Sequence, residues 1–187
     1  LNDSFRELRA RLKQGRDATS VSFEPIYYLI FHPRDILTAK RELPAWTAAL
    51  ANDGWNVERL SLAAEIQDIF QSAKLRPLWL KADARNPLAW ENTNGAFANY
   101  LDKSGVLQQR LRERLDALVN RPHGLLLVTD VEALHPYVRI GTLENTVFGQ
   151  YKTPSVILYP GTRTGTTRLK FLGFYPEDGN YRSVHIG

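Results

Sequence analysis

The chain has 187 residues, of which 43% are hydrophobic and 24% are charged, a composition that excludes an intrinsically disordered protein and allows a substantial core. It contains no cysteine, which excludes a disulfide framework, a cysteine-ligated zinc site and a cysteine nucleophile. The formal net charge of +4 permits a nucleic-acid or acidic protein partner without requiring one.

No apolar run in the sequence approaches the roughly 20 residues that a membrane-spanning helix needs, and no signal peptide is visible. The absence of cysteine agrees with a reducing compartment. These observations predict a cytoplasmic protein that does not bind a membrane.

A helix is predicted over residues 2–14, because Phe5, Leu8 and Leu12 recur on one face of it. Cations surround this apolar stripe at Arg6, Arg9, Arg11, Lys13 and Arg16. Two interpretations stay open: a cationic face that only water solvates, or a contact for phosphate or for an acidic partner.

The first strands of the predicted sheet follow this helix. Residues 26–31 read IYYLIF, an aromatic and β-branched run that is typical of a core strand. A helical pattern and a turn at Gly54 separate this run from a second predicted strand over residues 55–60. Ser61 has a side chain that helix N-termini prefer, so a helix is predicted directly after this strand.

Residues 75–95 are harder to interpret, because prolines and a glycine interrupt any long element. We predict an excursion from the sheet that contains one short helix. A helical pattern returns at residue 97 and extends to residue 118, with Gly105 as the expected division. Three arginines of this pattern are expected to form a solvated face: Arg110, Arg112 and Arg114.

Two apolar runs organise the last third of the chain. Residues 125–128 and 156–159 are apolar at consecutive positions, which favours strands near 125–129 and 154–159 that are buried on both faces. Between these runs, Ile140, Leu143 and Val147 recur at helical spacing. The order strand, helix, strand predicts a βαβ unit with parallel strands.

Residues 168–174 and 181–186 alternate well enough to predict two further strands, with turn chemistry between them. We therefore predict an antiparallel hairpin at an edge of the sheet. The whole chain, residues 1–187, is predicted to form a single α/β domain. It has three layers, with a mostly parallel sheet flanked by helices.

The strand over residues 125–129 is followed by two acids, Asp130 and Glu132, and looks like the Walker B strand of nucleoside triphosphatases. The phosphate-binding sequence G-x-x-x-x-G-K-[ST] that this strand needs as a partner does not occur in the chain. We therefore predict a P-loop-like fold without a Walker A loop, and no cofactor. A divalent-metal-dependent nuclease or phosphatase using these two acids is the weaker alternative.

Polar side chains gather after the predicted strands, at the edge where open α/β sheets tend to bind ligands and partners. Five of them are predicted to form a partner or anion surface: His135, Tyr137, Arg139, Arg163 and Arg168. The glycine-rich segment 161–168 is suited to an anion or a nucleic acid, although a turn between strands needs glycine anyway. A DNA- or nucleotide-binding accessory subunit is therefore an alternative function.

No catalytic or metal-ligating residue is assigned from the sequence. The four histidines form no pair at the spacing of a helical metal site, and no G-x-S-x-G nucleophile motif occurs.

Several segments of the C-terminal half match one known family: Thr129 with His135-Pro136-Tyr137, Leu143-Glu144-Asn145, Pro154 to Gly161, Leu172-Gly173 and Tyr181-Arg182. Together with the N-terminal strand sequence IYYLIFHP, they resemble BrxB, a small component of bacteriophage exclusion (BREX) defence systems. The resemblance spans nearly the whole chain.

This resemblance implies a cytoplasmic protein of prokaryotic phage defence. Its neighbours in such a system are a site-specific DNA methyltransferase, a large ATPase and a PglZ-like protein of the alkaline phosphatase type. The implied function is a non-catalytic adaptor that binds the PglZ-like protein, with the ATPase and the methyltransferase as further candidate partners. Direct contact with DNA stays open.

Overall fold

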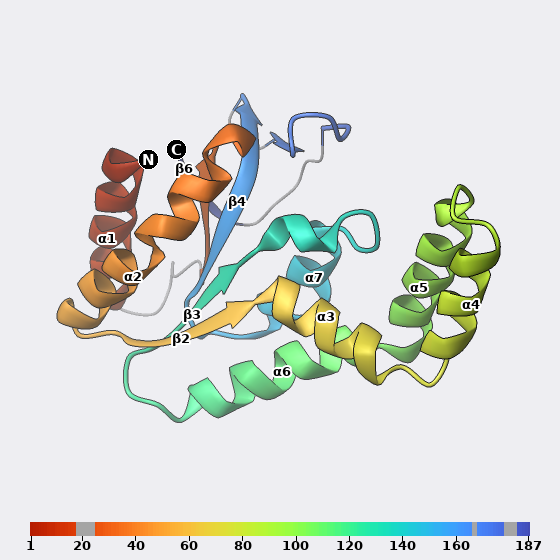
Figure 1. The fold of residues 1–187 in the computed structure, drawn as a ribbon. Helices are drawn as coiled ribbons and strands as arrows, with labels where there is room; N and C mark the ends of the chain where they lie inside the picture. Colours follow the sequence, from red (N-terminus) through yellow and green to blue (C-terminus); the bar gives the residue numbers. More distant parts are fainter. Residues whose placement is uncertain (18–24, 166–167, 178–182) are drawn as a thin grey trace.

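A computed structural model of the chain describes residues 1–17, 25–165, 168–177 and 183–187. At its centre lies a sheet whose strands are β1 (Ile26–Phe31), β2 (Asn56–Ser61), β3 (Gly124–Thr129), β4 (Ser155–Thr164), β5 (Arg168–Phe171) and β6 (Val184–Ile186). The strand order is β2-β3-β4-β1-β6, with β5 paired to β4 (Figure 1). All neighbours on the main path are parallel, which confirms the predicted α/β class and the mostly parallel sheet.

Both faces of this sheet are covered. Every residue of β1 and β3 is buried, as expected for strands with helices on either side. Side chains that alternate along β1 enter two different cores: Tyr28 lies in one cluster and Leu29 in the other. The chain therefore has the three predicted layers.

The first layer consists of α1 (Asn2–Asp17) and α2 (Ile36–Asn52). The apolar stripe of α1 packs against the sheet, and Leu8 and Leu12 are fully buried. Phe5 of α1 stacks on Trp46 of α2, with ring centroids 4.8 Å apart. The helix predicted over residues 2–14 is confirmed, although it continues for three residues beyond its predicted end.

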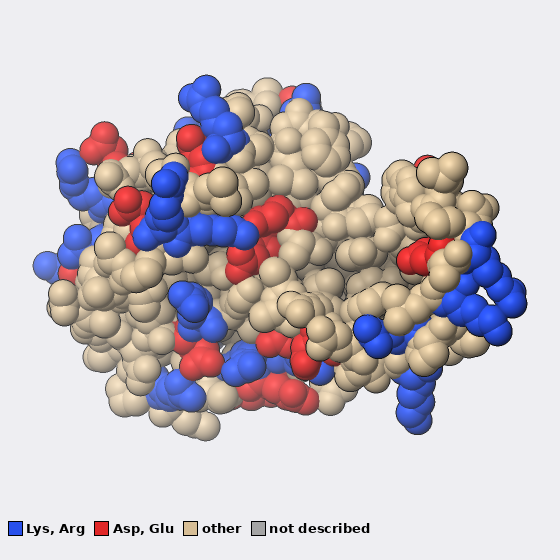
Figure 2. Space-filling view, viewed as in Figure 1, with Lys and Arg blue, Asp and Glu red and all other residues tan. Residues whose placement is uncertain are grey.

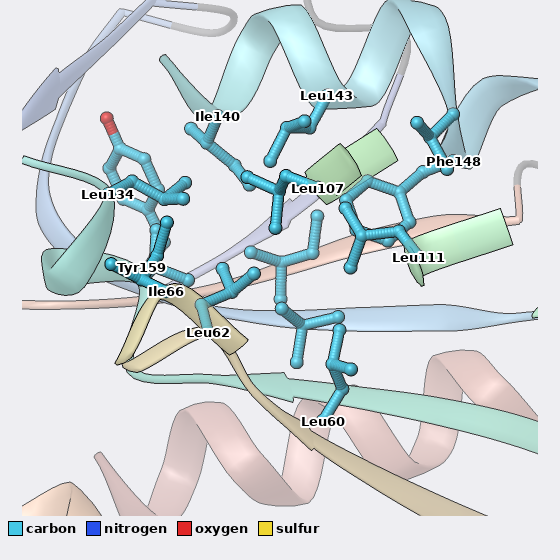
Figure 3. Packing of buried hydrophobic residues seen from close by; sticks show 14 of the residues in the cluster. Leu60, Leu62, Ile66, Leu107, Leu111, Leu134, Ile140, Leu143, Phe148 and Tyr159 are labelled. Carbon is cyan, nitrogen blue, oxygen red and sulfur yellow. The ribbon is translucent and has the colours of Figure 1, made fainter. Parts of the chain in front are cut away.

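The opposite layer consists of α3 (Leu62–Ser72), α6 (Val106–Val119) and α7 (Ile140–Thr146), which enclose the larger core (Figure 3). The Ser61 cap is confirmed, because its Oγ accepts the backbone N–H of Ala64 at 3.2 Å. Arg110 of α6 is not simply solvated as predicted. It is half-buried and bridges Glu65 and Asp68 of α3, at 3.1 Å and 2.6 Å.

Two helices, α4 (Arg76–Arg85) and α5 (Trp90–Ser104), form an arm that projects away from the sheet (Figure 1). The predicted excursion over residues 75–95 is confirmed, with α4 as its short helix. The helix predicted from residue 97 is α5, which begins earlier, at Trp90. Gly105, with a φ of 61°, separates α5 from α6 as predicted. Within the described residues, no helix combines the length and the apolarity that crossing a bilayer requires.

The predicted C-terminal hairpin is wrong in its pairing. β5 runs antiparallel to the end of β4, whereas β6 adds to the other side of the main sheet and runs parallel to β1. The physical reason is that β4 continues past the main sheet, so its last backbone groups need a new partner, and β5 supplies it. Residues 178–182, which include the expected turn, lie outside the described residues.

The P-loop-like description is not confirmed either. Where a phosphate-binding loop would follow β1, the chain enters a 3₁₀ turn over Pro33–Asp35. The side chain of His32 accepts the backbone N–H of Arg34 at 3.2 Å, so this turn satisfies its own backbone.

A buried hydrogen bond joins the sheet to the second layer. The hydroxyl of Tyr28 in β1 donates to Glu144 Oε2 in α7 at 2.7 Å, and Glu144 is 3% exposed. We expect Tyr28→Phe to lower the free energy of unfolding by about 1–3 kcal/mol, because it removes a hydrogen bond to a buried acidic side chain. Urea unfolding followed by circular dichroism measures this loss.

The matched control is Tyr100→Phe, because the Tyr100 hydroxyl has no hydrogen bond to a described residue in the structure. If Tyr28→Phe destabilises the chain no more than this control does, the hydrogen bond does not stabilise the fold.

Candidate functional site

The two predicted acids, Asp130 and Glu132, lie at the carboxyl edge of the sheet, directly after β3. Asp130 has a φ of 58° and begins the 3₁₀ turn Val131–Leu134. Both carboxylates face Lys40 of α2, whose Nζ lies 2.7 Å from Asp130 Oδ1 and 2.7 Å from Glu132 Oε1. Basic and acidic side chains meet near the centre of this face in Figure 2. The edge therefore carries a lysine bridge that the sequence analysis did not predict.

Hydroxyl groups complete the surroundings of Asp130. Ser61 Oγ donates to Asp130 Oδ2 at 2.6 Å, and Thr129 Oγ1 donates to the same oxygen at 2.9 Å. Burial raises the pKa of Asp130, but the hydrogen bonds from Lys40, Ser61 and Thr129 outweigh it and hold the pKa below its usual value. Asp130 thus joins the ends of β2 and β3 to α2 as a charged structural link.

This arrangement bears on the metal-dependent alternative. The ammonium of Lys40 lies where two carboxylates would otherwise share a cation. Among the described residues, no group of three or more His, Cys, Asp or Glu side chains is placed to hold a metal ion. Burial lowers the pKa of Lys40, but the hydrogen bonds with both acids outweigh it and raise the pKa, so the amine stays charged.

Two of the five predicted surface residues meet at one aromatic cluster. His135 forms a hydrogen bond through Nδ1 with the hydroxyl of Tyr175, and its ring lies edge-on to Tyr175 and Phe174. The guanidinium of Arg139 stacks over Tyr175, with Cζ 4.0 Å from the ring centroid. Phe174 is 64% exposed, so this cluster presents an aromatic ring to the outside.

The other three predicted residues do not join that cluster. Tyr137 turns toward the arm, where its hydroxyl donates to Asn94 Oδ1 at 3.4 Å, and burial raises its pKa. Arg163 donates to the carbonyl of His185 at 3.4 Å. Arg168 forms an exposed ion pair with Glu177 at 3.7 Å. Tyr137, Arg163 and Arg168 therefore belong to three separate local contacts, apart from the cluster that His135 and Arg139 share.

The arm carries a surface that the sequence analysis missed. Eight large hydrophobic residues are exposed among the described residues, and five of them lie between positions 75 and 90: Leu75, Leu78, Leu80, Leu88 and Trp90. Basic side chains gather over the same end of the molecule (Figure 2). The available signal was the set of leucines and tryptophans around Pro77 and Pro87. These residues follow no helical period that separates buried from exposed positions.

An aromatic core holds the two arm helices together. Trp79 of α4 is 6% exposed and packs against Phe97 and Tyr100 of α5, with centroids 5.5 Å apart in each case. Tyr137 lies edge-on to Phe97 at 4.9 Å, which connects the arm to the carboxyl edge. The exposed leucines therefore stand on a packed helical pair.

The fold and these surfaces define a three-layer α/β protein with a projecting helical arm and a lysine-bridged acidic edge. The family model described as BREX protein BrxB matches residues 81–186, more than half of the chain. The chain belongs to the BrxB family of BREX phage-defence systems. No curated protein and no solved structure matches it. The match includes most of the arm, the second layer from α6 onward and the carboxyl edge after β3.

The charge state of Asp130 leads to a prediction about acid stability. Its pKa is lower in the folded chain than in the unfolded chain, so its charge stabilises the fold above the unfolded value of about 3.9. This contribution is lost as the pH falls through the folded-state pKa. We expect Asp130→Asn to lower the free energy of unfolding by about 2 kcal/mol at neutral pH. Below about pH 4, the stability of this variant should fall less steeply with pH than that of the wild type.

Urea unfolding over a series of pH values measures both effects. The matched control is Asp3→Asn, because the Asp3 side chain is 92% exposed. The residual acid sensitivity of the Asp130 variant should come in part from Asp53, whose pKa is lowered chiefly by its hydrogen bond from Arg9. If the free energy of unfolding of Asp130→Asn falls below about pH 4 as steeply as that of the wild type, the lysine bridge does not stabilise the fold.

Proposed function

We propose that this BrxB protein is a non-catalytic interaction component of a BREX complex and binds the PglZ-like protein through its helical arm. The observation that carries the proposal is the concentration of exposed apolar side chains on the arm. Leu78 is 64% exposed, Leu88 is 89% exposed and Trp90 is 57% exposed. A concentration of exposed apolar side chains on one part of a protein is typical of an interaction site.

The position of these side chains suits a partner that holds the arm on more than one side. Leu78 and Leu80 flank the buried Trp79 along α4, at about 100° to either side of it. Leu88 lies in the connection between α4 and α5, at the opposite end of α4 from Leu75. A groove that receives the arm would remove all of these side chains from water, which contributes about 25 cal/mol for each Å² of apolar surface.

Positive charge near the exposed leucines of the arm indicates what kind of surface the partner should have. Lys74, Arg76, Lys81 and Arg85 accompany the exposed leucines of α4 in the sequence. The complementary surface is therefore an apolar groove with an acidic rim, because complementary charges increase the association rate and exclude wrong partners. The choice of the PglZ-like protein rests on the resemblance to BrxB, and the arm supplies the surface.

The lysine-bridged edge supports the non-catalytic part of the proposal. Chemistry that uses Asp130 and Glu132 would first need to displace the ammonium of Lys40 from both carboxylates. The hydroxyls of Ser61 and Thr129 already occupy the second oxygen of Asp130. These contacts make the acids structural in this proposal.

We expect the chain to co-elute with the PglZ-like protein of its own system in size-exclusion chromatography with light scattering at physiological salt. Leu78→Glu should weaken the complex at least about tenfold, because it places a charge within the apolar contact. Isothermal titration calorimetry gives the dissociation constants.

The matched control is Leu37→Glu, because Leu37 is also helical, is 70% exposed and lies on α2. Separate elution of the two wild-type proteins would remove the PglZ-like protein as a stable binary partner, and the ATPase and the methyltransferase would be tested next. A complex that tolerates Leu78→Glu as well as Leu37→Glu would place the interface elsewhere.

A further inference from the structure

A cationic groove lies beside α1. Helix α1 lies at the other end of the molecule from the arm (Figure 1). It encloses about 300 Å³ between α1 and the turn that follows α2. Four cations line it, together with one carboxylate and one indole: Arg6, Arg9, Lys13, Arg16, Asp53 and Trp55. Four of the cations that surround the apolar stripe of α1 in the sequence thus form one wall of this groove.

Two of the four cations are fixed by the turn. Arg9 donates to Asp53 through two nitrogens, Nε at 2.6 Å and Nη2 at 2.7 Å. Arg16 donates to the backbone carbonyl of Asp53 at 3.0 Å and lies over the Trp55 ring, with Cζ 5.4 Å from its centroid. These contacts hold the guanidiniums in place before any ligand arrives, which lowers the entropic cost of binding.

The groove keeps an excess of positive charge. Asp53 is the single carboxylate among the lining residues. The hydrogen bond from Arg9 lowers the pKa of Asp53, and the charges of Arg16 and Lys13 lower it further against the effect of burial. The field in the groove therefore favours anions.

The other two cations are available to a ligand. Lys13 has no ion-pair partner among the described residues. Arg6 pairs only with Asp3 at 3.3 Å, and both side chains are highly exposed, so water and a ligand compete easily with this pair.

The four cations lie in a row rather than around a point. Their spacing of three, four and three residues keeps them on one side of α1, and the row extends over about 15 Å at the rise of an α-helix. A row of this kind matches an anion whose charges repeat along a line. Arginine also binds phosphate oxygens through two donors at once.

We propose that this groove binds the phosphodiester backbone of a nucleic acid without reading its sequence. Protein interfaces have an apolar core, and none of the exposed large hydrophobic residues of the described chain lines the groove. Nucleic-acid interfaces are polar and positively charged instead. Trp55 is 6% exposed and covered by Arg16, so it gives the bases no platform for stacking.

The test uses the full chain and fluorescently labelled oligonucleotides of mixed sequence, both single-stranded and duplex. Fluorescence anisotropy measures the affinity between about 50 and 200 mM salt. We expect salt-sensitive binding that is independent of sequence. In the variant Arg6→Gln/Lys13→Gln, the slope of log affinity against log salt should become shallower by about two, one for each lost phosphate contact.

The matched control is Arg11→Gln/Arg41→Gln, which removes the same charge from exposed positions outside the groove. No salt-sensitive binding, or an equal loss in both double variants, would overturn the proposal. Polyglutamate and ATP are also tested as competitors at matched charge. If either competes as well as the unlabelled oligonucleotide does, the groove is a general anion site and the proposal is overturned. The arm is intact in every variant, so the outcome is independent of binding to the PglZ-like protein.

Discussion

Strands β1 and β3, and the first seven residues of β4, are buried on both faces of the central sheet, and much of the structure follows from this constraint. Strands without a polar face need a helical layer on each side, and α1 with α2 and α3 with α6 and α7 supply the two layers. The faces of the sheet are consequently used for packing. Surfaces for other molecules are left to the carboxyl edge, the outer sides of the helices and the projecting arm.

At the carboxyl edge, the charged side chains of Asp130 and Glu132 both bind Lys40 and so stabilise the fold. Asp130 receives hydrogen bonds from two strand ends and an ion pair from α2, so one carboxylate fixes three elements that meet there. The same residues in a Walker B setting would face a magnesium ion and a phosphate-binding loop. A 3₁₀ turn capped by His32 takes the place of that loop, and Lys40 takes the place of the cation.

The sequence was sufficient to predict β1, β3 and β4 from their consecutive apolar residues, and also the Ser61 cap and the division at Gly105, because each depends on local chemistry. The pairing of β5 and β6 was not predictable in this way, since it depends on how far β4 continues past its neighbours. Lys40 was missed for a related reason: its partners lie 90 and 92 residues away in the chain. The arm leucines were missed because exposure on α4 follows the packing of Trp79, which a local pattern does not reveal.

Two of the surfaces that are left to other molecules differ both in position and in chemistry. The arm carries exposed apolar side chains, and the groove beside α1 is lined by four cations. Helix α1 and the arm lie at opposite ends of the molecule (Figure 1). Exposure of the apolar side chains to water is unfavourable, whereas the cations attract anions. In the two proposals, the partner protein binds the arm and the nucleic acid binds beside α1, so the two would not compete for space. Under these two proposals, contacts of such different chemistry on one scaffold would let this BrxB protein hold a BREX component close to a nucleic acid.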